Sequence, residues 1–261
     1  MALLLAGLGL MVGAQQPGPS HDERPPMRVG FLSNYAPFSF IGPDGRLQGF
    51  DIDVFVAICD AMGWRFESLA DTMAGLQQKL RAEMIDGIGN QLLYTPQNRR
   101  IFKFIQPAYA SIQLHAVQHE DDSRDFFSLD ELVGKRLGVL ADSGIEQRAR
   151  AVLGQGVVGF AHATDTLRAL SAGELDVVLE ESLIADYYIE QEKLPLKVTA
   201  PFAAPVAVGL VVNKDDHGMQ QRWSQAVKTV LNNGTVAKIS QRWFGYDVSQ
   251  PRAANSQDVK P

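Results

Sequence analysis

Arg28-Val29-Gly30-Phe31-Leu32-Ser33-Asn34 is an apolar run that ends in small polar residues, and Arg136-Leu137-Gly138-Val139-Leu140-Ala141-Asp142 repeats it later in the chain. A second repeat follows each run, because residues 80–88 and residues 170–178 both have the pattern of a helix end that leads into a buried strand. Two halves that each have the predicted order strand, helix, strand are best explained by two similar α/β lobes. A cleft between two such lobes is a common place for a small molecule to bind.

The composition fits a folded protein with a substantial core. The chain has 261 residues, of which 46% are hydrophobic and 21% are charged, which suffices for one or two domains and argues against wholesale disorder. The formal net charge of −6 argues against a nucleic-acid partner, because nucleic-acid binders usually present a basic surface. Cys59 is the one cysteine, so no disulfide can form within the chain, and apolar neighbours at helical spacing predict a buried structural thiol.

The N-terminus has the pattern of an export signal. Residues 2–13 are almost entirely apolar, but about a dozen residues are too few for a bilayer span, which takes ~20. Val12-Gly13-Ala14 places small residues before a cleavage point after Ala14. We therefore expect a signal peptide over 1–14 and a periplasmic protein, with a buried N-terminal helix as the alternative. Residues 15–26 and 248–261 are expected to form a disordered lead-in and a disordered tail.

Strands and helices are predicted to alternate along the rest of the chain. Pro43-Asp44-Gly45 predicts a turn within residues 38–50, and Asp51 or Asp53 is expected to cap the helix that follows, which Gly63 ends. Further strands are predicted over 28–32, 64–69, 85–89, 137–140, 157–160, 175–179 and 206–212. Further helices are predicted over 74–84, 145–153, 166–172, 183–190, 219–231 and 236–244. Such alternation implies mostly parallel sheets with right-handed crossovers.

Six motifs in a fixed order resemble those of a known family. They are Tyr35-Ala36-Pro37-Phe38, 44–53, Ile85-Asp86-Gly87-Ile88, Thr95-Pro96, 132–139 and 234–245. Over residues 27–247 the chain resembles family 3 of the solute-binding proteins that serve ABC transporters for amino acids. The resemblance implies an α/β, two-lobed periplasmic binding protein type II fold, in which each lobe is a mostly parallel sheet flanked by helices. It implies a first lobe from 27–110 and 206–247, a second from 111–205, and two hinge crossovers near 110–114 and 202–209.

The resemblance also implies a ligand pocket with residues from both lobes. Tyr35 matches an aromatic residue that packs on the ligand, and Glu181 matches the acid that receives the ligand's ammonium group. The plainer alternatives are packing at the lobe edge for Tyr35 and a solvated charge for Glu181.

The polar end of the ligand would meet two further segments. Asn90, Gln91 and Leu93 fall where the family offers backbone and side-chain hydrogen bonds. Ser143 and Gly144 fall at the start of a second-lobe helix, where free N–H groups and the positive end of the helix dipole suit a carboxylate. A helix cap alone is the plainer alternative for Ser143.

Three positions depart from the family pattern. Asn98 stands where amino-acid binders of the family usually carry an arginine, and an amide cannot replace the charge or the fork of a guanidinium that grips a carboxylate. Leu32 replaces a frequent acid, and Met73 replaces a frequent aromatic residue and is expected to pack on an apolar ligand body. A standard free α-amino acid is therefore in doubt, and a modified amino acid, another small amine or acid, and a degenerate pocket all stay open.

Other kinds of chemistry have weaker support in the sequence. His115 and His119 have an even spacing, but no third metal ligand is evident, so neither a metal nor a cofactor is expected. The fold also resembles that of cyclohexadienyl dehydratases, in which Glu181 could act as a general acid, and a sensory or partner-binding module is another alternative. We favour a monomeric binding protein that is not an enzyme and that delivers a small polar ligand to an ABC permease in the inner membrane.

Overall fold

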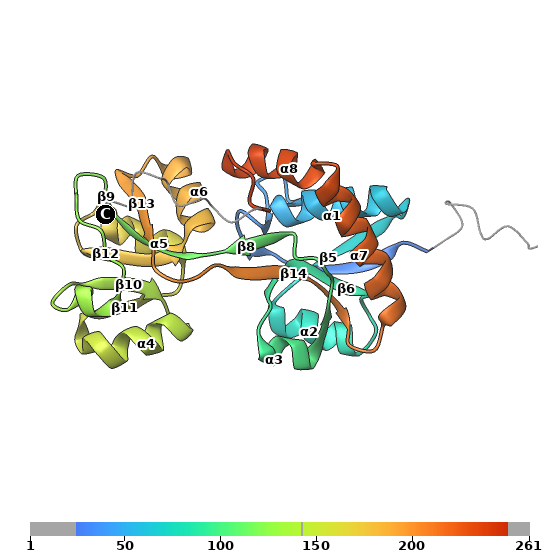
Figure 1. The fold of residues 1–261 in the computed structure, drawn as a ribbon, viewed down its shortest axis with the longest axis horizontal. Helices are drawn as coiled ribbons and strands as arrows, with labels where there is room; N and C mark the ends of the chain where they lie inside the picture. Colours follow the sequence, from blue (N-terminus) through green and yellow to red (C-terminus); the bar gives the residue numbers. More distant parts are fainter. Residues whose placement is uncertain (1–24, 142, 250–261) are drawn as a thin grey trace, which may run out of the picture.

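The computed structural model describes residues 25–141 and 143–249, and its helices and strands form two α/β lobes side by side (Figure 1). The predicted signal peptide, most of the predicted lead-in and the tail from residue 250 lie outside the described residues. We call the part that carries the sheet with β1 lobe one, and the part that carries the sheet with β10 lobe two. Within the described part of the chain, no helix combines the length and the apolar character that crossing a bilayer requires.

The sheet of lobe one combines parallel and antiparallel strands. Its strand order is β5-β1-β6-β14-β7, with β8 also paired to β14. The strands β5, β1 and β6 are parallel, whereas β14 runs antiparallel to its neighbours. The strand bounds are β1 Met27–Leu32, β5 Phe66–Asp71, β6 Gly87–Leu93, β7 Phe102–Phe104, β8 Ala110–Ile112 and β14 Val206–Asn213. The helices of this lobe are α1 Phe50–Met62, α2 Met73–Arg81, α3 Pro96–Ile101, α7 His217–Asn232 and α8 Thr235–Phe244.

Lobe two repeats this plan with the strand order β11-β10-β12-β9-β13. The strands β11, β10 and β12 are parallel, and β9 runs antiparallel to both of its neighbours, β12 and β13. The strand bounds are β9 Leu114–His119, β10 Leu137–Leu140, β11 Val157–Phe160, β12 Val177–Glu181 and β13 Leu196–Pro201. The helices are the 3-10 turns η1 Leu129–Leu132 and η2 Gly154–Gly156, together with α4 Gly144–Leu153, α5 Ala163–Ser171 and α6 Ser182–Glu192. The repeated runs of the sequence therefore become β1 and β10, each inside a parallel trio.

A small three-stranded sheet forms the edge of lobe one that faces lobe two. It consists of β2 Asn34–Tyr35, β3 Ser39–Ile41 and β4 Leu47–Gln48, so the predicted turn at Pro43-Asp44-Gly45 is present. Gly49 follows with φ 139°, and an added Cβ would collide with the backbone of Phe38.

The predicted cap of α1 is wrong. Gly49 occupies the N-cap position, and no side chain caps the helix. Asp51 is fully buried and bonds to groups inside lobe one, while Asp53 accepts a hydrogen bond from Trp243 Nε1 at 2.8 Å. Both carboxylates therefore serve tertiary contacts.

Two segments cross between the lobes and are joined to each other. β8 pairs with β14 from Ala110↔Val208 to Ile112↔Val206. Beyond these strands, Phe202 N–H donates to Leu114 O at 2.8 Å. Figure 1 shows the two crossing segments running side by side between the lobes. The two predicted hinge crossovers are thus present as a hydrogen-bonded ribbon.

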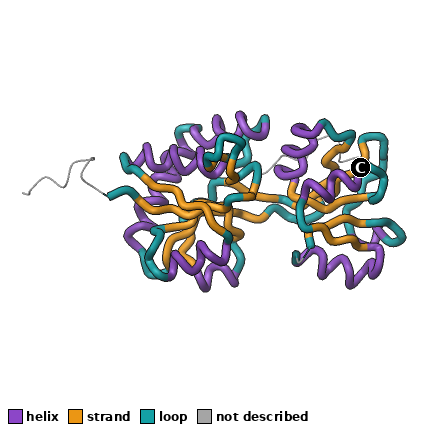
Figure 2. Tube along the Cα trace, turned by 180° about the vertical axis from the view of Figure 1, so that it is seen from behind, coloured by secondary structure: helices purple, strands orange, loops and turns teal. Residues whose placement is uncertain are grey.

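The lobes also share an apolar contact on one side of this ribbon. Leu183 and Ile184 of α6 are 3% and 7% exposed and belong to the hydrophobic cluster of lobe one, which includes Phe38 and Phe50. Figures 1 and 2 show α6 beside α8, whereas α4 lies with α2 and α3 on the other side of the ribbon. Burial of these side chains stabilises one relative placement of the lobes.

Ile184→Ala tests this contact. The loss of a buried side chain should lower the free energy of unfolding by about 2–5 kcal/mol. Val152→Ala is the matched control, because Val152 is 45% exposed on α4, and it should change stability by less than about 0.5 kcal/mol. Urea titrations of both variants measure the difference, and equal stabilities would contradict the buried contact.

Candidate functional site: residues that meet between two lobes

Tyr35 and Glu181 come from different lobes and meet where the two lobes face each other. Tyr35 lies in β2 of lobe one, and Glu181 is the last residue of β12 in lobe two. The Tyr35 hydroxyl donates to Glu181 Oε2 at 3.5 Å, which is a long hydrogen bond between partly buried groups. The structure therefore brings together the two residues predicted to hold the body and the ammonium group of a ligand.

Glu180 places a second carboxylate beside Glu181. The Glu180 side chain is 7% exposed, and its Oε1 accepts the backbone N–H of Glu181 at 2.8 Å. Burial raises the pKa of Glu180 to about 7. Burial and then the charge of Glu180 raise the pKa of Glu181 to about 8, although the hydrogen bond from Tyr35 opposes the shift. Burial and Glu181 also hold the pKa of Tyr35 well above its usual value, so Tyr35 remains a neutral donor.

A buried carboxylate organises the lobe-one wall behind Tyr35. Asp51 accepts hydrogen bonds from the Tyr109 hydroxyl at 2.7 Å, from Gln91 Nε2 at 3.1 Å and from Asn90 Nδ2 at 3.2 Å. Asn90 also donates to Ser39 Oγ at 2.6 Å. Burial raises the pKa of Asp51 to about 7, while these hydrogen bonds favour the ionised form. The side chains of Asn90 and Gln91 thus point into lobe one and tie the middle of β6 to α1.

The remaining lobe-one candidates lie around the ends of β6 and α2. Asn98 Nδ2 donates to Leu93 O at 3.0 Å, and Asn98 N–H donates to Thr95 Oγ1, the N-cap of α3, at 3.1 Å. Leu93 is the last residue of β6 and is 37% exposed. Met73 begins α2 and packs, partly buried, against a hydrophobic cluster of lobe one. Asn98 is therefore bonded to its own lobe through its amide.

Ser143 and Gly144 begin α4 in lobe two, as the sequence predicts. Ser143 Oγ accepts Glu146 N–H at 3.2 Å and donates to Leu140 O at 2.5 Å, so this hydroxyl caps the helix. Gly144 is exposed, and an added Cβ would meet nothing within 4 Å. The first-turn N–H groups of α4 remain suited to an anionic group.

Sequence reasoning missed the roles of Asp51, Tyr109 and Glu180. Two adjacent acids at the end of an apolar strand were a readable signal for Glu180, because an acid at that position must be paired or neutralised when it is buried. No local pattern pointed to the bond between Asp51 and Tyr109, since 58 positions separate the two residues.

Comparison with known proteins decides the family. The sequence profile of the bacterial extracellular solute-binding proteins, family 3, matches residues 27–246. The chain belongs to this family.

The relatives of this solute-binding protein match it over most of their length. It is 28% identical over 254 residues to the L-arginine-binding protein of Pseudomonas aeruginosa, covering 94% of this chain and 97% of that protein. It is 25% identical over 229 residues to the L-cystine-binding protein TcyJ of Escherichia coli, covering 87% and 86%. The fold is similar to that of the L-cystine solute receptor of Neisseria gonorrhoeae in its unliganded open conformation, with a TM-score of 0.74, 24% identity, and coverage of 88% and 97%.

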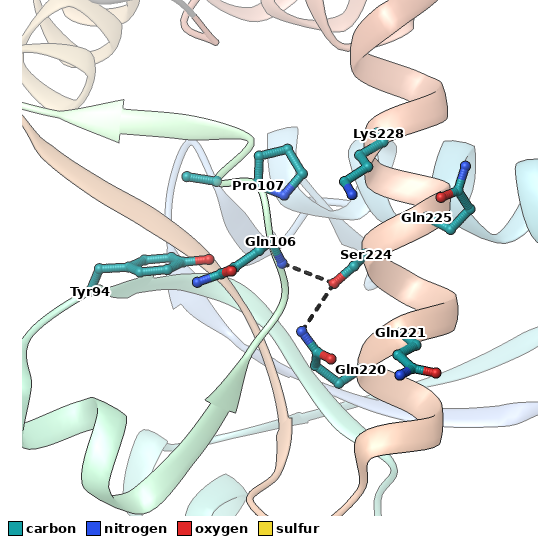
Figure 3. A pocket seen from close by; sticks show the side chains of 9 residues that line it. Tyr94, Gln106, Pro107, Gln220, Gln221, Ser224, Gln225 and Lys228 are labelled. Atoms are coloured by element: carbon teal, nitrogen blue, oxygen red, sulfur yellow. Dashed lines mark hydrogen bonds between the residues drawn. The ribbon is translucent and has the colours of Figure 1, made fainter.

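A separate hollow of about 760 Å³ lies on lobe one of the solute-binding protein, between α7 and the loop that leads to β8 (Figure 3). Ser224 Oγ accepts the backbone N–H of Gln106 at 3.0 Å and Gln220 Nε2 at 3.4 Å. These bonds tie α7 to the approach of a crossing strand. The hollow contains none of the predicted site residues.

The histidine pair does not form a metal site. His115 Nδ1 lies 2.9 Å from Thr199 O inside lobe two, whereas His119 lies beside Asp121 on the surface. Among residues 25–141 and 143–249, no three His, Cys, Asp or Glu side chains gather in a way that could hold a metal ion.

Glu181→Gln is expected to change how stability depends on pH. The pKa of Glu181 is about 8 in the folded protein against 4.5 for an ordinary glutamate, so the folded state binds more protons between these values. Stability therefore falls as the pH rises through that window, and the amide variant lacks this loss. The melting temperature of Glu181→Gln minus that of the wild type should grow from about pH 5 to about pH 9. Glu67→Gln, on the exposed side of β5, is the surface control, and a difference that stays flat for Glu181→Gln would contradict the shifted pKa.

Proposed function

We propose that this protein captures a small solute with an ammonium group, an amino acid or a related amine, and delivers it to an ABC permease in the inner membrane. It acts in the periplasm as a monomeric binding protein and not as an enzyme. The family and the amino-acid ligands in the names of its relatives support this proposal. The observation that carries it is the Glu180–Glu181 pair opposite Tyr35.

The electrostatics of the cleft favour a cation. Two adjacent buried carboxylates resist ionisation because each loses water and each opposes the charge of the other. An ammonium group beside Glu181 supplies the missing countercharge and converts the carboxyl group to a strong acceptor. Because Tyr35 and Glu181 belong to different lobes, a solute that contacts both prefers the closed arrangement and shifts the protein towards it.

The other predicted residues take two kinds of role. Tyr35, Met73 and Leu93 pack on the solute body, while Asn98, Ser143 and the Gly144 N–H meet its polar or acidic end. We assign Asn90 and Gln91 to the support of the lobe-one wall behind Tyr35, since their side chains bond to Asp51.

The amide side chain at position 98 indicates which class of solute the protein binds. Asn98 cannot grip a carboxylate with two charged donors, and its amide already donates to Leu93 O. The ammonium end therefore contributes more to recognition than the acidic end. An amine or a carboxyl-modified amino acid should bind better than an ordinary amino acid of the same side chain.

One observation supports a rival function, that of a dehydratase. A carboxyl group with a pKa of about 8, as Glu181 has, is protonated at neutral pH and can donate a proton to a leaving group. Incubation with prephenate or arogenate, followed by absorbance of the aromatic product, separates the two functions. Turnover would overturn the binding-only proposal.

Glu181→Gln should weaken the binding of the solute. A thermal-shift screen of amino acids and amines first identifies the compound that raises the melting temperature most. Calorimetry should then show that Glu181→Gln reduces its affinity by about 10- to 100-fold, the range expected for a lost hydrogen bond to a charged group. Glu67→Gln is again the control, and an unchanged affinity in Glu181→Gln would refute the assigned role.

Asn98→Arg should have the opposite effect on ordinary amino acids. A guanidinium at this position adds a bidentate, charge-assisted contact to an α-carboxylate. We expect an affinity gain of about tenfold in calorimetry for standard amino acids, and no gain for amines that lack the carboxylate. A similar gain for both classes would show that residue 98 does not face the carboxylate.

A further inference from the structure

The hollow between α7 and the loop before β8 is built on a stripe of polar residues along α7. Gln220, Ser224 and Lys228 follow one another at intervals of four residues, which places them on one face of the helix. Gln106 and Pro107 of the loop form the facing wall (Figure 3). We call this space the α7 hollow. Its volume of about 760 Å³ is in the range of pockets that hold small molecules.

The charge of the lining is positive, although the chain as a whole has a formal net charge of −6. Lys228 contributes this charge, and none of the nine residues that line the α7 hollow is Asp or Glu. Across the described residues, no carboxylate forms an ion pair with Lys228. An anion in the hollow would therefore meet an uncompensated ammonium group, whereas a cation would be repelled by it.

Ser224 adds a hydrogen-bond donor beside this ammonium group. Its side chain is 9% exposed, and its Oγ accepts Gln106 N–H at 3.0 Å and Gln220 Nε2 at 3.4 Å. The same Nε2 lies 3.4 Å from Phe104 O, which fixes the nitrogen end of the Gln220 amide on this side. A hydroxyl group accepts two hydrogen bonds and donates one, so the Ser224 O–H is left without an acceptor among the described residues. A carboxylate that accepts from Lys228, one helical turn along, can accept from Ser224 as well.

The rest of the lining suits a polar ligand body. The side-chain amides of Gln106, Gln221 and Gln225 form no hydrogen bond with another described residue. Each amide offers donors and an acceptor, and a ligand hydroxyl group can use both kinds. Tyr94 lies at the end of the hollow away from Lys228, and its hydroxyl already donates to Ile105 O, so Tyr94 contributes its ring (Figure 3).

We propose that the α7 hollow is a second binding site, for a small organic monocarboxylate with a hydroxylated body. The carboxylate accepts from Lys228 Nζ and from the Ser224 hydroxyl, and the glutamine amides bind the hydroxyl groups. Hydrogen bonds with a charged partner are roughly twice as strong as neutral ones, so the carboxylate end contributes most of the affinity. The site lies on lobe one and shares no residue with the Tyr35–Glu181 contact, so it does not rest on the proposed function.

Gluconate and two matched compounds test the proposal. Sorbitol has the hydroxyl groups of gluconate without its charge, and hexanoate has a carboxylate on a six-carbon chain without hydroxyl groups. NMR titration of the full protein, labelled with ¹⁵N, should show gluconate binding about tenfold or more tighter than either compound. The titration is run at low ionic strength, because Lys228 is exposed and salt screens its charge. The backbone resonances that shift should be those of residues 106–108 and 220–228.

Lys228→Gln should lower the affinity for gluconate by about tenfold, since it removes the charged donor and keeps a side chain of similar length. Lys238→Gln is the matched control, because Lys238 is also an exposed helical lysine but lies on α8 outside the lining, and it should bind gluconate like the wild type. Ser224→Ala should also weaken gluconate, and circular dichroism with melting temperature establishes that each variant is folded.

Three results would overturn the proposal. The first is equal binding of gluconate and sorbitol, or of gluconate and hexanoate. The second is equal gluconate binding by Lys228→Gln and Lys238→Gln. The third is a set of shifted resonances around Glu181 in place of those along α7, which would put the carboxylate between the lobes. The proposed function concerns a different site, so it stands if the α7 hollow fails these tests.

Discussion

The contact between Tyr35 and Glu181 is the constraint around which the two lobes are arranged. A tyrosine from a small edge sheet of lobe one reaches a carboxyl group at the end of a central strand of lobe two. Glu180 stands next to it, and burial raises the pKa of both glutamates. Buried acids without a cation are costly to ionise, and the ammonium group of the solute that we propose would lower this cost.

Lobe one supports this contact through buried polar groups rather than through the hydrophobic core alone. Asp51 joins β6, through Gln91, to Tyr109, which precedes the crossing strand β8. The wall of the cleft and the approach to the hinge are therefore held by one carboxylate. The apolar contact of α6 with the core of lobe one adds a second link between the lobes.

The sequence predicted the repeated parts of the fold well because they depend on local patterns. The runs 28–34 and 136–142 lead to β1 and β10, and the Ser143 cap and the Gly154 end of α4 are where the pattern places them. The strand β13 was missed, since Lys197 and Thr199 break its apolar run and its partner β9 is nearly eighty positions earlier. The cap expected from Asp51 failed for the same reason: its partners are supplied by the distant strand β6 and by Tyr109. Family resemblance pointed to Tyr35 and Glu181 as site candidates, and the fold places these two side chains next to each other. It did not give the direction in which Asn90 and Gln91 point, because that direction depends on the tertiary partner.

The most direct test of the account is the number of protons exchanged when the solute binds. Calorimetry of the best amine near pH 7 in two buffers with different ionisation enthalpies measures it. Glu181, with a pKa of about 8, is mostly protonated before binding, and an ammonium group should drive it to the carboxylate. Release of close to one proton per bound amine is expected. Binding without proton release, or with proton uptake, would contradict it.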